Sequence, residues 1–212
     1  SLPSKSPTAP PTTVPRAGHS TGRLKVGDLT RTYRLYVPAK AAQADATVPL
    51  LVALHGGGGS GAHFESDAGF DALADSAGFV VAYPDAVRPP GGQVATWDAG
   101  NCCGYAARTG IDDVGFVRTL ITSLRAKYPI DERRIYVDGF SNGGMLAYRV
   151  ACQLAGTVAA VGAQSATLEY APCQPSRPVS LIHIHGTADT NVPLAGGPGS
   201  GRANADYTPP QQ

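Results

Sequence analysis

Ser141 stands in the stretch whose residue types and spacing are best suited to activate a nucleophile. Residues 135–138 are rich in β-branched and aromatic side chains, and they lead directly into Gly139-Phe140-Ser141-Asn142-Gly143. A Gly-x-Ser-x-Gly turn between a strand and a helix exposes the serine hydroxyl to a base and to a substrate carbonyl. We therefore predict that Ser141 is a nucleophile and that the backbone N–H of Asn142 faces the resulting oxyanion. The alternative is that Ser141 only caps the following helix.

The same pattern occurs a second time at residues 18–22, in a chain that contains 26 glycines among 212 residues. This copy lies in a segment rich in proline, serine and threonine, with no strand pattern before it and no helix pattern after it. Because such a motif has meaning only in the right structural context, we exclude Ser20 and retain Ser141.

Composition and charge restrict the class of protein. With 42% hydrophobic and 16% charged residues, the 212-residue chain fits one well-buried globular domain. The net charge is +1 and no basic run stands out, so neither nucleic acid nor an anionic membrane surface is expected as a partner. No run of about 18 apolar residues is present, so we expect no transmembrane helix.

Residues 1–22 are predicted to form an extended linker, because five prolines among serines and threonines cannot bury enough apolar surface to fold. We expect the folded domain to occupy residues 23–212. The chain begins with Ser1 rather than Met, which fits a mature form whose leader has been removed. A tail of this kind often links a domain to an export signal or anchor, so we expect a secreted or surface-anchored protein.

The rest of the chain alternates between strand and helix patterns. An alternating run at 31–37 predicts an antiparallel strand that pairs with residues 24–26. Apolar runs predict buried strands at 49–54, 79–84, 135–138, 158–163 and 179–185, and helical spacing predicts helices at 64–77, 113–127 and 141–152. Because such alternation requires crossover connections, we predict a doubly wound α/β domain with a mostly parallel sheet and an antiparallel start.

Ligands of such sheets bind beyond the carboxyl ends of the strands, and three further segments fall there with Ser141. The glycine run at 56–59 can bring backbone N–H groups close to a ligand. The loop at 85–111 is long enough to indicate a function. Its Trp97 and Tyr105 either stack on a substrate or pack on their own scaffold.

Asp189 is the third feature at this edge, because it follows the predicted strand at 179–185 almost directly. A carboxylate there can orient an imidazole. Its alternative role is to cap the turn into Val192.

The four cysteines permit three complete pairings and favour an oxidising compartment. Cys152 ends the helix that begins near Ser141, and Cys173 precedes the strand at 179–185, so both belong at the amino end of the sheet. We predict a Cys152–Cys173 disulfide. Cys102 and Cys103 then lie near the rim of the site as a strained vicinal pair, as free thiols, or as partners of a group outside the chain.

No histidine follows Asp189, although five occur earlier, at positions 19, 55, 63, 183 and 185. His183 and His185 share one face of a strand, but no other residues are placed to complete a metal site with them. We therefore expect neither a metal nor a cofactor, and we interpret these two histidines as hydrogen-bonded scaffold for the turn that presents Asp189.

Taken as a set, the motifs resemble those of a known group of enzymes. The sequences HGGGG at 55–59, WDAGNCCG at 97–104, DDVGF at 112–116, GFSNGGM at 139–145 and HIHGTAD at 183–189 follow the order found in secreted α/β-hydrolases of the polyhydroxybutyrate depolymerase and feruloyl/acetylxylan esterase group. The chain resembles most of all the lipoprotein esterases called LpqC, over about residues 23–200. The resemblance implies that Ser141 is the nucleophile, that Asp189 is the acid, and that Gly57 and Asn142 form the oxyanion hole.

The resemblance also implies that a part of the fold is absent. In α/β-hydrolases the catalytic histidine follows the acid, and similar proteins continue past Gly199 with a strand, that histidine and a closing helix. We therefore interpret the chain as truncated. We expect a secreted serine carboxylesterase or depolymerase that acts through an acyl-enzyme on hydroxyalkanoate, acetyl or feruloyl esters, including polymeric ones, with turnover lowered on the order of 10⁴-fold. The alternatives are a peptidase on the same fold, or a catalytically dead hydrolase fold that serves as a binding or surface module.

Overall fold

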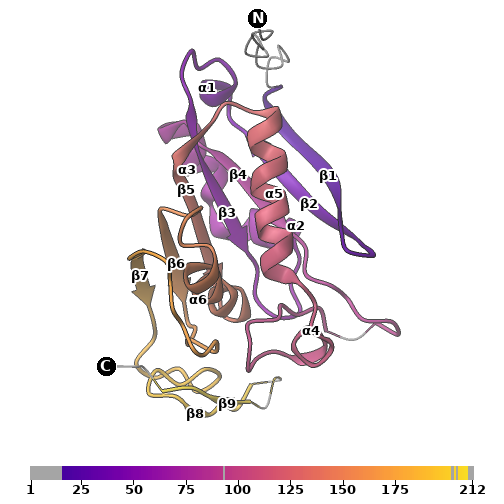
Figure 1. Ribbon diagram of the computed structural model, residues 1–212, viewed down its shortest axis with the longest axis vertical. Coiled ribbons are helices and arrows are strands. Elements are labelled where there is room, and N and C mark those ends of the chain that lie inside the picture. Colours follow the sequence, from indigo (N-terminus) through magenta and orange to yellow (C-terminus); the bar gives the residue numbers. More distant parts are fainter. Residues whose placement is uncertain (1–15, 93, 202, 204, 210–212) are drawn as a thin grey trace, which may run out of the picture.

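A seven-stranded sheet forms the centre of the computed structural model, which describes residues 16–92, 94–201, 203 and 205–209. The strand order is β1-β2-β4-β3-β5-β6-β7 (Figure 1). The strands are β1 (Gly18–Val26), β2 (Leu29–Val37), β3 (Val48–Leu54), β4 (Val80–Pro84), β5 (Ile130–Phe140), β6 (Ala160–Gln164) and β7 (Ser180–Ile184). β1 and β2 pair antiparallel, β2 pairs antiparallel with β4, and all later pairs are parallel. The predicted α/β sheet with an antiparallel start is thereby confirmed.

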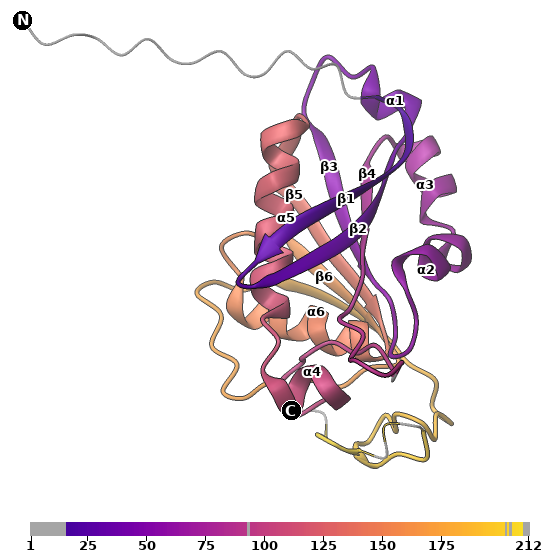
Figure 2. The same ribbon diagram turned by 90° about the vertical axis from the view of Figure 1, so that its right-hand side faces the viewer.

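Helices cover both faces of this sheet. They are α1 (Ala39–Ala42), α2 (Gly61–Ala68), α3 (Phe70–Ala77), α4 (Gly104–Thr109), α5 (Asp113–Lys127) and α6 (Asn142–Gln153). Figure 2 shows α5 and α6 on one face and α2 and α3 on the other. A second, small sheet consists of β8 (Gly197–Pro198) and β9 (Asp206–Tyr207) and lies beyond the carboxyl ends of the parallel strands (Figure 1). Within the described residues, no helix has the length and apolar character needed to cross a membrane.

The main core lies between the sheet and the helices α5 and α6. Apolar residues of β3, such as Leu50 and Leu54, are fully buried together with Leu120 and Leu124 of α5. α5 begins where predicted, because the Asp112 side chain accepts a hydrogen bond from the Gly115 N–H and caps the helix. Its apolar stripe then faces the sheet.

Several element boundaries differ from the sequence prediction, and β5 begins at Ile130, five residues before the predicted strand. The helix expected at 64–77 is two helices, because Gly69 adopts a left-handed conformation with φ of 69° and turns the chain between them. β1 begins at Gly18, inside the range expected as a linker, because residues 18–22 pair with β2. β6 begins two residues later than predicted. The rest of the predicted linker, residues 1–15, lies outside the described residues.

β7 departs most from its prediction. Its apolar sequence predicts a buried strand, but Leu181, Ile182 and Ile184 are 49%, 61% and 57% exposed. β7 is the last strand in the sheet order, so only β6 pairs with it among the described residues. The pattern therefore identifies the strand correctly, whereas its expected burial is wrong because the described chain supplies no second neighbour.

Candidate active site

Ser141 lies at the sharp turn between β5 and α6. Its φ is 53° and its ψ is −124°, an unusual conformation for a residue with a side chain. The flanking glycines make the turn possible. A Cβ on Gly139 would overlap the carbonyl of Gly143, and a Cβ on Gly143 would overlap the carbonyl oxygen of Leu54. The turn therefore requires both glycines and holds Ser141 in a strained conformation between strand and helix.

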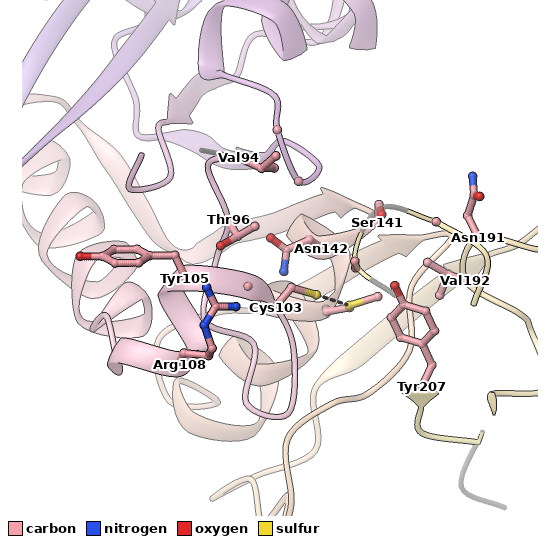
Figure 3. Close-up of a pocket in the computed structure, with 16 residues that line it drawn as sticks. Val94, Thr96, Cys103, Tyr105, Arg108, Ser141, Asn142, Asn191, Val192 and Tyr207 are labelled. Carbon is pink, nitrogen blue, oxygen red and sulfur yellow. Dashed lines mark hydrogen bonds between the residues drawn. The ribbon is translucent and has the colours of Figure 1, made fainter. Parts of the chain in front are cut away.

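A cavity of about 600 Å³ opens in front of Ser141. Figure 3 shows the labelled side chains around it, which come from four separate parts of the chain. The wall includes Gly57 and Gly58 of the glycine loop, Tyr105 and Arg108 of α4, and Val192 and Tyr207 from the segments after β7. A space of this size accommodates a small ester or the end of a longer one.

Asn142 joins the start of α6 to the loop at Trp97. Its side-chain oxygen accepts a hydrogen bond from the Trp97 N–H at 2.7 Å, and its side-chain nitrogen donates to the Trp97 carbonyl at 3.0 Å. The Trp97 indole N–H donates in turn to the carbonyl of His55 at 2.8 Å. The Gly58 N–H donates to the Ala95 carbonyl at 2.7 Å. These bonds fix the glycine loop, the Trp97 loop and the beginning of α6 relative to one another.

Gly57 and Asn142 meet beside this network. A Cβ placed on Gly57 would lie 3.8 Å from the Cβ of Asn142, so the two backbones are close. Asn142 is the first residue of α6, and its N–H has no acceptor within the helix. Both residues line the cavity next to Ser141, which is the geometry in which their N–H groups can receive a negatively charged oxygen.

A buried ion pair supports the Trp97 loop from behind. Arg31 of β2 lies 2.7 Å from Asp113 of α5, and both side chains are at most 2% exposed. The second oxygen of Asp113 accepts a hydrogen bond from the Asp98 N–H at 2.7 Å. Burial raises the pKa of Asp113 to about 6, although Arg31 acts in the opposite direction. The Arg31 guanidinium also lies over the Phe116 ring, 4.2 Å from its centroid. Sequence reasoning missed this pair, because β2 and α5 are 82 positions apart at the contact.

The two aromatic candidates of the long loop have different positions. Trp97 is 0% exposed and does not line the cavity, so the expectation that it stacks on substrate is wrong. Its indole instead packs within the scaffold, where the backbone carbonyl of His55 satisfies the N–H. Tyr105 lies in α4 and lines the cavity, as a substrate contact requires.

Asp189 lies on the opposite side of the site, in the turn after β7. One carboxylate oxygen accepts hydrogen bonds from the N–H groups of Asn191 and Val192, at 2.9 and 3.0 Å. The other oxygen is 3.5 Å from Nε2 of His185. The carboxylate therefore caps the turn into Val192, the alternative role considered for it. Asp189 is not among the residues that line the cavity, but Asn191 and Val192 are.

His183 and His185 belong to a chain of hydrogen bonds that begins at Tyr148. The Tyr148 hydroxyl contacts Nδ1 of His183, Nε2 of His183 is 3.0 Å from Nδ1 of His185, and Nε2 of His185 is 2.7 Å from the Val192 carbonyl. Since a carbonyl only accepts, Nε2 of His185 must carry a proton, and the remaining contacts can be satisfied with a neutral His183 ring. Burial and the neighbouring His185 lower the pKa of His183, which favours this neutral form.

The remaining histidines are also occupied elsewhere. Nδ1 of His55 is 2.7 Å from the Gly56 carbonyl, and Nε2 accepts the Ala86 N–H at 3.1 Å. Burial lowers the pKa of His55. His19 contacts Glu65, and His63 lies on α2. None of the five histidines lines the cavity, so within the described chain Ser141 has no imidazole beside it.

One group in the described residues brings potential metal ligands together, namely His19, Glu65 and Asp71. Its ligand atoms lie within 4.8 Å of one another, on β1, α2 and α3 rather than at the cavity. Arg34 already pairs with Glu65, and the Tyr83 hydroxyl donates to Asp71. We interpret the group as an ion-pair network that fastens β1 to the helices.

All four cysteines are paired in the structure. Cys152 pairs with Cys173, with Cα atoms 5.0 Å apart, and Cys102 pairs with its neighbour Cys103. Cys103 lines the cavity, and the first pair joins the end of α6 to the segment before β7. The vicinal arrangement is one of the alternatives that the sequence left open.

Comparison with known proteins places the chain among esterases. A putative esterase, NocK from Nocardia uniformis subsp. tsuyamanensis, is 32% identical over 192 residues, which are 90% of this chain and 52% of that protein. Feruloyl esterase B from Piromyces equi is 35% identical, over 72% of this chain and 28% of that protein. The bifunctional acetylxylan esterase/xylanase XynS20E from Neocallimastix patriciarum is 34% identical, over 75% and 21%. The chain thus spans between about a fifth and a half of the length of these relatives.

Solved structures share the fold. An acetyl xylan esterase from Aspergillus awamori matches with a TM-score of 0.58 and 22% identity, over 81% of this chain and 60% of that one. A thermostable esterase matches with a TM-score of 0.62 and 20% identity, over 83% and 48%. The family described as Esterase PHB depolymerase matches residues 31–173, which is more than half of the chain. The chain therefore belongs to the PHB depolymerase family of esterases.

Proposed function

We propose that this chain carries the nucleophile and oxyanion hole of a serine carboxylesterase. The observation that supports the proposal best is Ser141 in its strained turn, open to a cavity of about 600 Å³. In the proposed reaction, Oγ of Ser141 attacks the ester carbonyl, and the N–H groups of Gly57 and Asn142 stabilise the oxyanion. The alcohol leaves and an acyl-enzyme remains, which water then hydrolyses.

Asp189 is the proposed acid of the triad. Its position after β7 is at the same edge of the sheet as Ser141. One oxygen is held by two backbone N–H groups, and the other has no closer contact than His185 at 3.5 Å. That second oxygen is available to orient an imidazole, which is the role of the acid in a Ser-His-Asp triad.

The base is proposed to come from polypeptide that pairs with the free edge of β7. Two observations support this proposal: no histidine lines the cavity, and β7 exposes apolar residues along an edge that no described strand covers. A strand added parallel to β7 brings its carboxyl end to the edge where Asp189 lies. A histidine just after such a strand, in sequence beyond Gln212, would reach both Asp189 and Ser141. Without it, we expect the 212-residue chain to turn over esters on the order of 10⁴-fold more slowly.

The proposed substrates are esters of small acids, within the range that the names of the relatives suggest. Those names include acetylxylan and feruloyl esters, and the family name includes polyhydroxybutyrate. Hydroxyalkanoate, acetyl and feruloyl esters, free or in polymers, are therefore the substrates to test. The two disulfide pairs favour an oxidising, extracytoplasmic location.

The test compares the 212-residue chain with a form extended by the sequence that follows it in the gene. We expect hydrolysis of p-nitrophenyl acetate and fluorophosphonate labelling at Ser141 in the extended form, weak activity in the 212-residue chain, and neither in Ser141→Ala. Activity of the extended form that survives Ser141→Ala would refute the serine mechanism.

A non-catalytic binding module is the second candidate, because the described chain holds no imidazole beside Ser141. The same experiment separates the two. Failure of the folded, extended form to label or to turn over any of the three ester classes would favour the binding module.

A further inference from the structure

The charge of the cavity wall is carried by one arginine. Among the described residues that line the cavity, Arg108 alone is charged at neutral pH, and no aspartate, glutamate, lysine or histidine accompanies it. The other polar side chains on the wall, such as Thr96, Asn142 and Asn191, are neutral. A substrate that enters therefore meets a single fixed positive charge.

Arg108 has no partner within the described part of the chain. No hydrogen bond or ion pair joins its guanidinium to another described residue. Three less exposed arginines are paired: Arg31 with Asp113, Arg34 with Glu65, and Arg149 with Asp98. Figure 3 shows the Arg108 side chain directed from α4 toward the side of the cavity where Thr96 and Cys103 lie. The residue is exposed at the cavity wall, so its five donors are accessible to a ligand that binds there.

We propose that the substrate is an ester that carries a second, free carboxylate, and that Arg108 binds this carboxylate while Ser141 attacks the ester group. The inference rests on the proposed esterase function and narrows its substrate class. A guanidinium pairs with a carboxylate through two parallel charge-assisted hydrogen bonds, a stronger contact than any that the neutral wall offers. Acetyl and feruloyl groups carry no charge to pair with Arg108, so we expect their esters to bind in the cavity more weakly.

The experiment measures binding, because binding does not require a complete triad. The probes are the monomethyl esters of succinate, adipate and suberate, which keep one carboxylate, and the corresponding dimethyl esters, which keep none. Three chain lengths are used so that one spans the distance from Ser141 to Arg108. Dissociation constants are measured by NMR titration or calorimetry on the 212-residue chain, at low and at physiological salt.

We expect at least one monomethyl ester to bind about tenfold more tightly than its dimethyl ester, with the preference weakened by salt. Arg108→Gln should remove this preference and leave the affinity for dimethyl esters unchanged, whereas Arg108→Lys should retain part of it. The matched control is Arg133→Gln, because Arg133 is 92% exposed and distant from the cavity wall; it should bind like the wild type.

Equal affinity for the two ester series at all three lengths would overturn the proposal. So would a preference that persists in Arg108→Gln or disappears equally in Arg133→Gln. The outcome is independent of turnover: loss of the serine mechanism would appear as activity that survives Ser141→Ala, whereas loss of the carboxylate site appears only in these affinities. Circular dichroism of each variant verifies that it is folded.

Discussion

One side of the site around Ser141 is buried, whereas the other side is exposed. The side formed by the glycine loop, the Trp97 loop and the start of α6 is buried: His55, Trp97 and Asn142 are at most 3% exposed. The side formed by β7 and the turn at Asp189 is open, with Ile182 and Ile184 more than half exposed. After the roles proposed for them, the first is called the oxyanion side and the second the acid side.

The difference shows how each half is stabilised. The oxyanion side consists of segments that follow the central strands β3, β4 and β5, and hydrogen bonds from Asn142 and Trp97 connect its loops. The acid side is fixed by short-range bonds within its own turn and by the histidine chain to Tyr148. We therefore expect substitutions on the oxyanion side to act on the whole fold, whereas those on the acid side act locally.

Gly143→Ala should have the largest effect. The new Cβ would overlap the backbone carbonyl of Leu54, and a backbone atom cannot rotate away as a side chain can. We expect the free energy of unfolding to fall by more than about 4 kcal/mol, or the protein not to fold. Gly156→Ala is the matched control, because a Cβ there meets nothing within 4 Å. Equal stability of the two variants in chemical denaturation would show that the turn does not constrain the fold.

Asn142→Ala should be the next most severe change. It leaves the N–H of Trp97 buried without a partner, at about 1–3 kcal/mol, and removes one of two hydrogen bonds to the Trp97 carbonyl, which still accepts from the Cys103 N–H at 3.2 Å. We expect a loss of roughly 2–4 kcal/mol in the free energy of unfolding. Asn191→Ala, at an exposed position of the acid side, should change it by less than about 0.5 kcal/mol. A larger loss for Asn191→Ala would reverse the contrast between the two sides.

Because of the Arg31–Asp113 pair behind the oxyanion side, the free energy of unfolding of the protein should depend on pH. Burial raises the pKa of Asp113 to about 6 in the folded protein, above the value of about 3.9 in an unfolded chain. The folded state therefore binds the proton more tightly, and the stability that this group contributes is full below about pH 4 and is lost as the pH rises through 6.

Asp113→Asn removes this titration. We expect the unfolding free energy of the wild type, minus that of the variant, to fall by about 2 kcal/mol between pH 4 and pH 7. Urea denaturation of both proteins at four pH values measures it. A difference that increases with pH would mean that Arg31 lowers the pKa of Asp113 more than burial raises it.

Ile182→Ala should have the smallest effect, because this side chain of the acid side is 61% exposed. We expect a change of less than about 0.5 kcal/mol in the 212-residue chain. Ile135→Ala is the comparison, since Ile135 on β5 is 1% exposed and its truncation should cost about 2–5 kcal/mol. In the C-terminally extended form, Ile182→Ala should become clearly destabilising. An unchanged small effect there would argue against a strand that covers β7.

Local patterns predicted most of the secondary structure. The bounds of the helix at 113–127 were predictable from the cap at Asp112 and from the apolar stripe. Both features depend only on residues a few positions apart in the sequence. The turn at Ser141 was predictable because Gly139 and Gly143 satisfy a steric requirement of the turn itself. Gly69 was missed as a helix break, since a single glycine within an apolar pattern is also tolerated inside a helix.

Contacts between distant segments were not predictable in the same way. Trp97 lies in a loop whose sequence gives no period, so its burial against His55 was not visible. The ion pair of Arg31 with Asp113 joins two elements that only the sheet order brings together. Arg108 and Tyr105 share the cavity with Ser141 because α4 folds back over the carboxyl ends of the strands.

The sequence by itself determined the α/β pattern, the sharp turn at Ser141 and the family resemblance, because periodicity, glycine spacing and motif order are local properties. It also determined that no histidine follows Asp189 within these residues. Only the tertiary structure decided that Trp97 is scaffold and that, among the described residues, Arg108 has no partner on the cavity wall and β7 is an exposed edge. The physical reason is that burial and charge pairing depend on which segments become neighbours, and a residue's own sequence context does not specify its neighbours across the sheet.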